Sequence, residues 1–217
     1  MKKFKALLVV ACALLLVAAS VFGTMAYLTS TTGEVKNTFT VGKVKITLDE
    51  TQVGTDGKAL TGNNAARVKA NSYKLMPGHE YTKDPTVHVT AGSEDAYVRM
   101  NVKVNNLDNL KAAFPAVKYP DYYAGDVFLL EKLVKGWDSS KWAFQSFHTD
   151  TATYEFRYTD KATADADLPA LFTSIVIPGT VDKAALENLG EVEIVITADA
   201  IQAEGFDDAA AAWNAFQ

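Results

Sequence analysis

The sequence has one cysteine, Cys12, and three histidines among its 217 residues. Cys12 lies in an N-terminal segment that we expect to be removed, so the mature chain would contain no cysteine. This excludes disulfides, thiol chemistry and zinc sites built from cysteine, although exported domains often rely on disulfides for stability. Packing must therefore hold the fold together, with subunit contacts or a metal ion as the remaining sources of stability.

Positive charge is also scarce. After removal of the first 26 residues, the chain carries 18 Lys and Arg against 26 Asp and Glu, a formal net charge of −8. Binding to the phosphates of a nucleic acid needs clustered basic side chains, which release counterions from the backbone. The sequence contains no such cluster, so we expect no nucleic acid partner.

The N-terminus has the three parts of a secretory signal peptide. Three lysines within the first five residues precede the apolar segment 6–22, which only Ser20 interrupts. Thr24 and Ala26 then place small residues at the −3 and −1 positions of a cleavage site. Cleavage before Tyr27 would release 191 residues, a length that suits one domain with a sizeable core.

The N-terminus has two alternative interpretations. A retained membrane anchor is the main alternative, but the 17-residue segment is just shorter than the roughly 18 to 20 apolar residues of a spanning helix. A lipidated cysteine at Cys12 is disfavoured because only six residues separate it from Lys5. That is fewer than the roughly 7 to 15 residues of an apolar signal core.

Alternation of apolar and polar residues predicts a mainly β protein. The clearest strand covers residues 97–104, in which Val98, Met100, Val102 and Val104 share one face. Similar patterns predict strands at 39–48 with a β-bulge at Gly42, and at 85–89, 142–148, 152–158, 171–177 and 192–201. The last of these is apolar on both faces, which indicates a central strand.

Helical patterns are few and short. They predict a helix before Pro115 within an insertion at 105–138, a second at 182–189 and a C-terminal helix at 207–217. About eight strands without a βαβ rhythm predict an all-β fold, an antiparallel two-sheet sandwich with jelly-roll topology. The expected domain order is a signal peptide at 1–26, an N-terminal segment at 27–38 and the sandwich domain at 39–217.

The segment that follows the cleavage site is rich in threonine and prone to β structure, yet it has no hairpin partner nearby. Such a segment can add as a strand to the sheet of another subunit. A head-to-tail contact of this kind that does not close produces a filament. The side chains expected to anchor it are Tyr27, Leu28, Val35 and Phe39. The alternatives are an unstructured leader and an edge strand of its own domain.

Candidate catalytic and metal-binding residues give a weaker signal. His79, His88 and His148 are far apart, and no helical His-Glu-x-x-His motif is present. The acidic pairs at 94–95, 165–167 and 207–208 fit turns and helix caps. No serine lies in a nucleophile turn and no glycine loop fits a phosphate. We therefore assign no catalytic residue and expect no metal and no cofactor.

Aromatic residues gather in and beside the insertion. They are Tyr119, Tyr122, Tyr123, Trp137 and Trp142. Flat amphipathic rings of this kind can bind a polysaccharide or a protein partner when they are exposed. Packing of the insertion against the sandwich is the favoured interpretation.

Short segments spread over the whole chain form a further pattern. They are Ala-Tyr-Leu-Thr at 26–29, Asn-Thr-Phe-Thr at 37–40, Gly-Lys-Val-Lys-Ile at 42–46, Met-Pro-Gly at 76–78, Asp-Ala-Tyr-Val-Arg at 95–99, Ile-Val-Ile-Pro at 175–178, Ala-Ile-Gln-Ala-Glu-Gly-Phe at 200–206, and Trp213. Together they resemble the camelysin/TasA family of exported proteins. One segment departs from the family: Leu-Thr-Ser at 28–30 stands where an aromatic residue followed by a polar or acidic pair is usual.

The resemblance implies a jelly-roll protein that a dedicated signal peptidase releases to the cell surface or extracellular matrix of Gram-positive-type bacteria. It implies biofilm-matrix fibres as the product, with the chain itself as partner in a head-to-tail homopolymer. Other matrix proteins or a polysaccharide would be further partners. The family also brings a rival function, because camelysin is described as a surface metalloendopeptidase. A third hypothesis is a monomeric surface adhesin, with residues 27–38 folded back and the aromatic insertion exposed.

Overall fold

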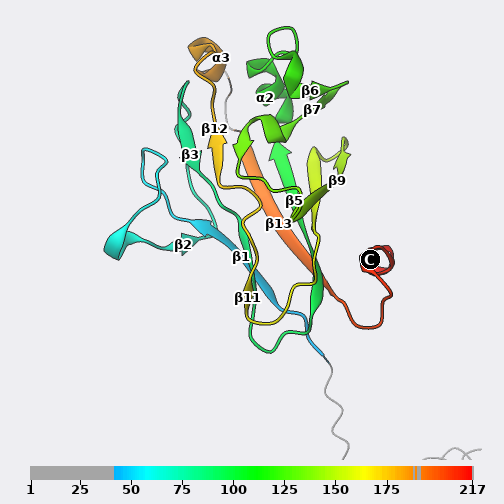
Figure 1. The fold of residues 1–217 in the computed structure, drawn as a ribbon. Helices are drawn as coiled ribbons and strands as arrows, with labels where there is room; N and C mark the ends of the chain where they lie inside the picture. Colours follow the sequence, from blue (N-terminus) through cyan, green and yellow to red (C-terminus); the bar gives the residue numbers. More distant parts are fainter. Residues whose placement is uncertain (1–41, 188, 190–191, 217) are drawn as a thin grey trace, which may run out of the picture. The chain divides into compact units, whose positions relative to one another are not determined.

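The computed structural model describes residues 42–187, 189 and 192–216. Residues 42–217 form one compact unit. The described residues are mainly β, with antiparallel pairing throughout and three short α-helices (Figure 1). No helix in this part of the chain is long and apolar enough to cross a membrane. The mainly β, antiparallel prediction is confirmed.

The first four-stranded sheet has the order β11-β4-β1-β2. Its strands are β1 (Ile46–Thr51), β2 (Arg67–Val68), β4 (Thr86–Val89) and β11 (Ala166–Asp167). Val87 and Val89 are buried on one face of β4, opposite Leu48 and Ile46 of β1, while His88 lies on the other face. This is the period-2 arrangement that the sequence predicted for β4.

The second four-stranded sheet has the order β13-β5-β10-β9. It consists of β5 (Ala96–Asn105), β9 (Trp142–His148), β10 (Thr153–Tyr158) and β13 (Glu193–Gln202). The predicted inner face of β5 is confirmed, because Val98, Met100, Val102 and Val104 are at most 1% exposed. The predicted strands at 142–148 and 152–158 are present as β9 and β10, and they pair as a hairpin with a register shift between Glu155 and Phe156.

Two smaller sheets complete the β structure. One joins β3 (Glu80–Thr82), β12 (Ser174–Val176) and β8 (Val134–Lys135), and the other is the hairpin of β6 (Tyr123–Ala124) and β7 (Val127–Phe128). The predicted insertion contains helix α2 (Leu107–Ala113), this hairpin and the 3₁₀ turns Pro120–Tyr122 and Leu130–Lys132. A further 3₁₀ turn, Gly62–Asn64, lies in the loop after β1.

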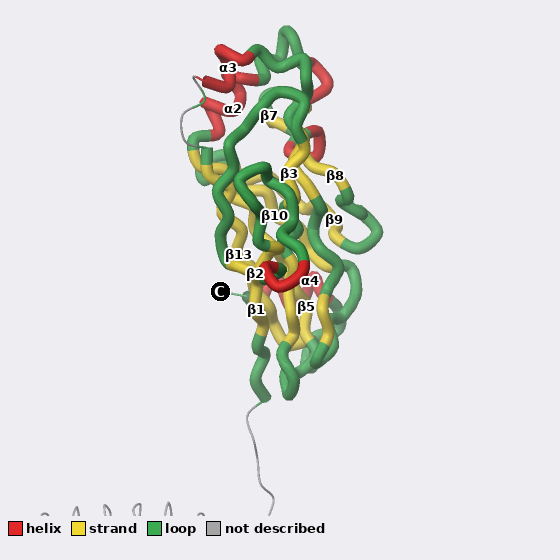
Figure 2. Tube along the Cα trace, turned by 90° about the vertical axis from the view of Figure 1, so that its left-hand side faces the viewer, coloured by secondary structure: helices red, strands yellow, loops and turns green. Residues whose placement is uncertain are grey.

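One hydrophobic cluster draws on both four-stranded sheets and on the insertion. Its largest fully buried side chains include Trp142, Phe114 and Met100, which come from β9, the end of α2 and β5. Helices α2 and α3 (Lys183–Glu187) lie at one end of the sheets, and the described chain begins at the other end (Figure 2). The insertion therefore extends the same core instead of forming a second one.

The C-terminal helix α4 (Ala209–Ala215) covers part of the outer face of the second sheet. Asp208 caps it by accepting a hydrogen bond from the Ala211 N–H (2.8 Å). The Arg99 guanidinium of β5 lies over the rings of both Trp213 and Phe216, 4.9 and 4.6 Å from their centroids. The sequence predicted this helix and its acidic cap, but not the arginine that holds it.

Two predictions about individual strands are wrong. Residues 42–45, expected in a bulged strand, belong to no strand; Lys43 O and Lys45 O instead accept hydrogen bonds from the turn at residues 90–94. The second error concerns β13, which was expected to be central. In the described chain it lies at the edge of its sheet and pairs only with β5. Apolar residues on both faces of a strand indicate that both faces are covered, not that the strand has a neighbour on each side. Here helix α4 covers Ile201 on the outer face of β13.

Candidate functional site

The long edge strand β13 is the first candidate site. It has ten residues, all paired with β5, and its other edge pairs with no strand of the part that the structure describes. Natural proteins commonly shorten, bulge or charge their edge strands, because an unpaired edge accepts further strands. A straight ten-residue edge is therefore a place where another chain can bind.

The direction of the backbone groups of β13 follows from its neighbour. In an antiparallel ladder, the N–H and C=O of successive residues point alternately to the two sides of a strand. Val104 of β5 donates its N–H to Ala152 O, on the side of β10 (3.0 Å). Odd-numbered β5 residues therefore face β13 and pair with its odd-numbered residues. The free edge consequently presents the backbone groups of Ile194, Ile196, Ala198, Ala200 and Gln202.

The side chains of four of these residues point toward the core, since their partners in β5 are Val104, Val102, Met100 and Val98. Those β5 partners are fully buried, whereas Ile194, Ile196, Ala198 and Ala200 are only partly buried. Strand β1 runs beside β13 without pairing to it, and its core-facing side chains Ile46 and Leu48 are partly buried too. We call these six partly buried residues the open seam. An added strand could cover it.

The residues predicted to act in export and assembly all precede this unit. Thr24, Ala26, Tyr27, Leu28, Val35 and Phe39 lie outside the described residues. Nothing in the described structure tests the cleavage site or the donor segment. The sequence analysis predicted a donor segment but not the unpaired edge of β13, for which the two-sided apolar pattern at 192–201 was the available signal.

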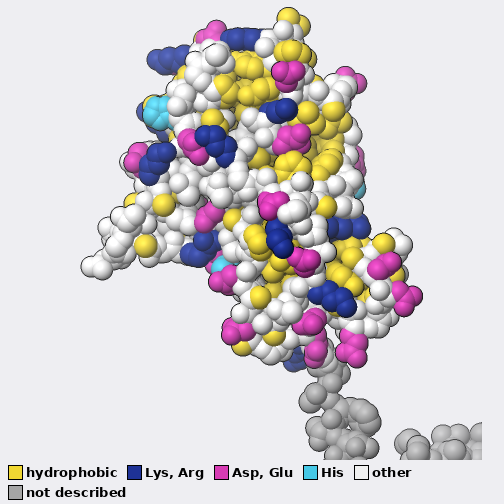
Figure 3. Space-filling model, in the orientation of Figure 1, with side chains coloured by type: hydrophobic (Ala, Val, Ile, Leu, Met, Phe, Trp, Pro, Cys, Tyr) yellow, Lys and Arg dark blue, Asp and Glu magenta, His cyan; other side chains and the backbone are white. Residues whose placement is uncertain are grey.

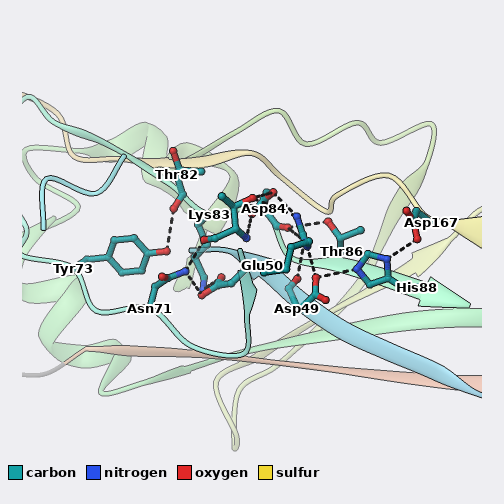
Figure 4. Close-up of polar contacts among 12 residues, drawn as sticks. Asp49, Glu50, Asn71, Tyr73, Thr82, Lys83, Asp84, Thr86, His88 and Asp167 are labelled. Atoms are coloured by element: carbon teal, nitrogen blue, oxygen red, sulfur yellow. Dashed lines mark hydrogen bonds and ion pairs between the residues drawn. The ribbon is translucent and has the colours of Figure 1, made fainter. Parts of the chain in front are cut away.

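A polar network on the first sheet is the second candidate site (Figure 4). Its solvent-facing half is centred on Asp49 of β1, which accepts hydrogen bonds from Arg67 and from His88 Nε2 (2.9 Å). Arg67 also reaches Asp84 (3.0 Å), and the other nitrogen of His88 lies 2.5 Å from an Asp167 carboxylate oxygen. These contacts tie β1, β2, β4 and β11 together on the face opposite the core.

His88 is charged in this arrangement. Each of its ring nitrogens faces a carboxylate oxygen, and a carboxylate only accepts, so both nitrogens must carry protons. Partial burial alone would lower the pKa of His88, but the hydrogen bonds to Asp167 and Asp49 outweigh it and raise that pKa above its ordinary value. Partial burial likewise opposes charge on Asp49, yet Arg67 and His88 hold the pKa of that carboxyl below its usual range.

This contact predicts a pH dependence of stability. Because the pKa of His88 is raised in the fold, its contribution is complete below the unfolded pKa of about 6.5 and is lost as pH rises through the higher folded pKa. We expect the melting temperature to fall by about 1 to 4 °C across that step, since a part-exposed pair contributes about 0.5 to 1 kcal/mol. Thermal melts between pH 5 and 9 would measure it.

His88→Gln is expected to abolish this step, and His79→Gln is the matched control because His79 is exposed and its ring, whose centroid lies 6.3 Å from that of Tyr81, forms no ion pair with the described residues. Asp49 titrates at much lower pH, so its loss of charge does not overlap the window. An equal step in the His88→Gln protein would contradict the assignment.

The three histidines occupy different elements. His88 lies on β4, His148 ends β9, and His79 precedes β3. His148 contacts Ser146 (3.1 Å) and stands 3.9 Å from Glu155. His88 contacts two carboxylates, one on each side of its ring. Among the described residues, no group of three or more His, Cys, Asp or Glu side chains is arranged to hold a metal ion. The three histidines therefore do not converge on a common site within the described residues.

The aromatic residues of the insertion are packed, as predicted. Tyr119 and Trp142 are 8% and 0% exposed, while Tyr122, Tyr123 and Trp137 are partly buried against the main core. The ring of Phe114 stacks on Tyr122 at 5.7 Å between centroids. One condition of the adhesin hypothesis, an exposed aromatic insertion, is therefore not met.

A shallow apolar pocket of about 300 Å³ lies between the insertion and the β9 edge. Its lining includes Phe144, Phe147 and Leu129, with Glu131 as the charged member, and Phe144 is 43% exposed. Hydrophobic side chains gather over β6, β7 and β9 on this face (Figure 3). The alternation pattern did not mark Phe144 as exposed, because Phe144 has the same position in the alternation of β9 as the buried Trp142.

Comparisons with known proteins identify no relative: no family model, curated protein or solved structure matches this chain.

Proposed function

We propose that this chain is a secreted structural protein that assembles into fibres at the cell surface or in the biofilm matrix of Gram-positive-type bacteria. In each contact, the N-terminal segment 27–38 of one copy adds as a strand to the open edge of β13 in the next. The observation that carries the proposal is this ten-residue edge. Four of the residues whose backbone groups point to the free edge also have core-facing side chains that are only partly buried. No residue has a catalytic role in it.

The chemistry of the two partners is complementary. The edge offers alternating N–H and C=O groups, which give a strand its affinity, and the open seam offers apolar surface for every second side chain. The segment before Gly42 supplies β-prone threonines for the ladder and apolar side chains at alternate positions, Tyr27 and Val35, for the seam, with Leu28 on the other face of the added strand. Donor and acceptor are different segments of the chain, so the contact is head-to-tail and can extend from copy to copy into a filament.

The same proposal includes the finer architecture. We infer that the two four-stranded sheets are the two layers of a jelly-roll sandwich. Support comes from the shared core, in which inward residues of β4 and β5 belong to one cluster. The open seam is then the side of the sandwich where β1 and β13 approach each other without pairing. An added strand would complete the layer to which β13 belongs.

Removal of the donor segment is the direct test. Residues 27–217 incubated at high concentration are expected to form filaments in negative-stain electron microscopy. A chain that starts at Phe39 is expected to stay monomeric, because it keeps the acceptor edge but lacks the strand that would occupy it. Size-exclusion chromatography of the shorter chain would confirm its monomeric state.

A peptide with the sequence of residues 27–38 serves as control. Added to the shorter chain, it should bind with a stoichiometry of one per chain, and added to the longer chain it should shorten the filaments. Filaments from both chains, or from neither, would contradict the proposal.

A further inference from the structure

The buried half of the polar network contains a lysine, a glutamate and an asparagine in one hydrogen-bonded chain (Figure 4). Lys83 Nζ donates to Glu50 Oε2 (2.6 Å), and Asn71 Nδ2 donates to Glu50 Oε1 (3.0 Å). The side chains of Lys83 and Glu50 are 8% and 6% exposed. An isolated ion pair gains little from such burial, because desolvation costs about as much as the attraction returns.

The orientation of the Asn71 amide is fixed by its other partners. The Val53 N–H donates to Asn71 Oδ1 (3.0 Å), and a backbone N–H can only donate. Asn71 Nδ2 donates a second hydrogen bond to Thr51 O (2.8 Å), which can only accept. The carbonyl of Asn71 is thus polarised by a backbone N–H, while its amide nitrogen faces the Glu50 carboxylate.

The backbone holds Glu50 and Lys83 in place. Glu50 is paired with Val68 in the sheet, and the Lys83 N–H donates to Thr173 O (3.1 Å). Tyr73 closes the site: its ring lies 5.9 Å from Lys83 Nζ and its hydroxyl donates to Thr82 O (3.0 Å). Burial raises the pKa of Tyr73, and the negative charge of Glu50 raises it further. The Tyr73 hydroxyl therefore stays protonated and acts as a hydrogen-bond donor.

We propose that Lys83 and Asn71 form an intramolecular amide cross-link, with Glu50 as general acid and base. Glu50 takes a proton from the Lys83 ammonium, which frees the nitrogen lone pair, and Nζ attacks Cγ of Asn71. A new C–N bond forms as the carbonyl π electrons move onto Oδ1. Collapse of this intermediate breaks the Cγ–Nδ2 bond as Glu50 returns its proton to the departing nitrogen; the Glu50 carboxylate then takes the second proton from Nζ and passes it to the ammonia, which leaves as ammonium. The products are a secondary amide and ammonium, and no oxidant or other reactant is needed.

Each contact in the cluster has a role in this reaction. The Val53 N–H points at the oxygen on which negative charge develops, as an oxyanion donor does. Glu50 contacts both the nucleophile and the leaving group, so one carboxyl can carry the proton between them. Burial excludes water, which would otherwise hydrolyse the amide. Because one carboxylate holds both nitrogens, the reactants need no encounter step.

The cross-link would join the segment after β2 to the segment after β3 and close a loop that consists of residues 71–83. It would supply the covalent constraint that a mature chain without cysteine cannot obtain from disulfides. This inference does not depend on fibre assembly, because all its groups belong to one chain.

Mass spectrometry of the protein secreted from cells that express the full chain tests the proposal. We expect an intact mass lower by one ammonia than the sequence of the processed chain. Proteolysis should yield a branched peptide that joins Asn71 to Lys83, with no tryptic cleavage after Lys83. An unreduced mass with Asn71 and Lys83 on separate peptides would overturn the proposal, and so would a hydrolysed Asn71 beside a free Lys83.

Three variants assign the roles. Lys83→Met and Asn71→Ala should each restore the mass expected without ammonia loss, as should Glu50→Gln if circular dichroism shows it folded. Lys135→Arg is the matched control, because Lys135 forms an exposed ion pair with Glu80 and should leave the cross-link complete. A complete cross-link in folded Glu50→Gln would overturn the role of Glu50. The measurement on the unaltered protein decides the main question even if a variant does not fold.

Discussion

Replacing Ile196 by lysine is expected to abolish filament formation. Ile196 lies in the middle of β13, its backbone groups point to the free edge, and its side chain belongs to the open seam. An incoming strand would bury the new ammonium without a partner, which is the way natural edge strands prevent further pairing. Negative-stain microscopy of residues 27–217 carrying Ile196→Lys should show no filaments where the unaltered chain forms them.

The adjacent residue provides the matched control. Thr197 is exposed on the opposite face of β13, so Thr197→Lys adds the same charge to the same strand and should leave assembly intact. Ala198→Pro tests the backbone alone, because it removes an N–H that points to the free edge and leaves the ladder with β5 in place. We expect it to block assembly with little change in the circular dichroism spectrum. Filaments from both Ile196→Lys and Ala198→Pro would show that assembly uses another surface.

Trp142→Ala is expected to have the largest effect on stability. Trp142 is fully buried at the start of β9, and its indole N–H donates to Pro169 O (2.8 Å). Truncation leaves a cavity and removes the donor of that hydrogen bond, a combined cost of about 3 to 5 kcal/mol. For a domain of this size, the melting temperature should fall by roughly 10 to 15 °C, measured by circular dichroism or calorimetry.

Phe144→Ala, two residues further along β9, is the control for this loss. Phe144 is 43% exposed and lies at the apolar pocket, so its removal should cost less than about 1 kcal/mol. The contrast separates loss of a buried ring from loss of an aromatic residue in general. Equal melting temperatures for the two variants would contradict the packing described for the insertion.

Much of the fold could be predicted from the sequence because its strands obey a strict period of two. The inner face of β5, the β9–β10 hairpin, the short helix before Pro115 and the capped C-terminal helix all follow from local pattern. Local pattern could not predict which strands are neighbours. The edge position of β13 depends on long-range pairing. The same apolar residue suits a face covered by a helix and a face covered by another strand, so the sequence pattern does not distinguish the two arrangements.

The polar network was beyond sequence reasoning for a different reason. Glu50, Asn71 and Lys83 are each ordinary residues in the sequence, and none belongs to a recognised motif. Their meeting requires the end of β1, the segment after β2 and the segment after β3 to converge. His88 could be placed on the polar face of its strand, but its two carboxylate partners come from β1 and β11, 39 and 79 residues away in the chain. Spacing along a sequence carries no information about such contacts.

The alternation along β13 has a consequence for the geometry of a fibre. Edge-facing backbone groups recur at every second residue, so an incoming strand that shifted by one residue would turn its apolar side chains away from the seam. Allowed registers therefore differ by two residues, or about 7 Å along the strand. Subunit spacing in a filament would accordingly change in discrete steps, and a two-residue deletion before Gly42 would alter the helical repeat while preserving polymerisation.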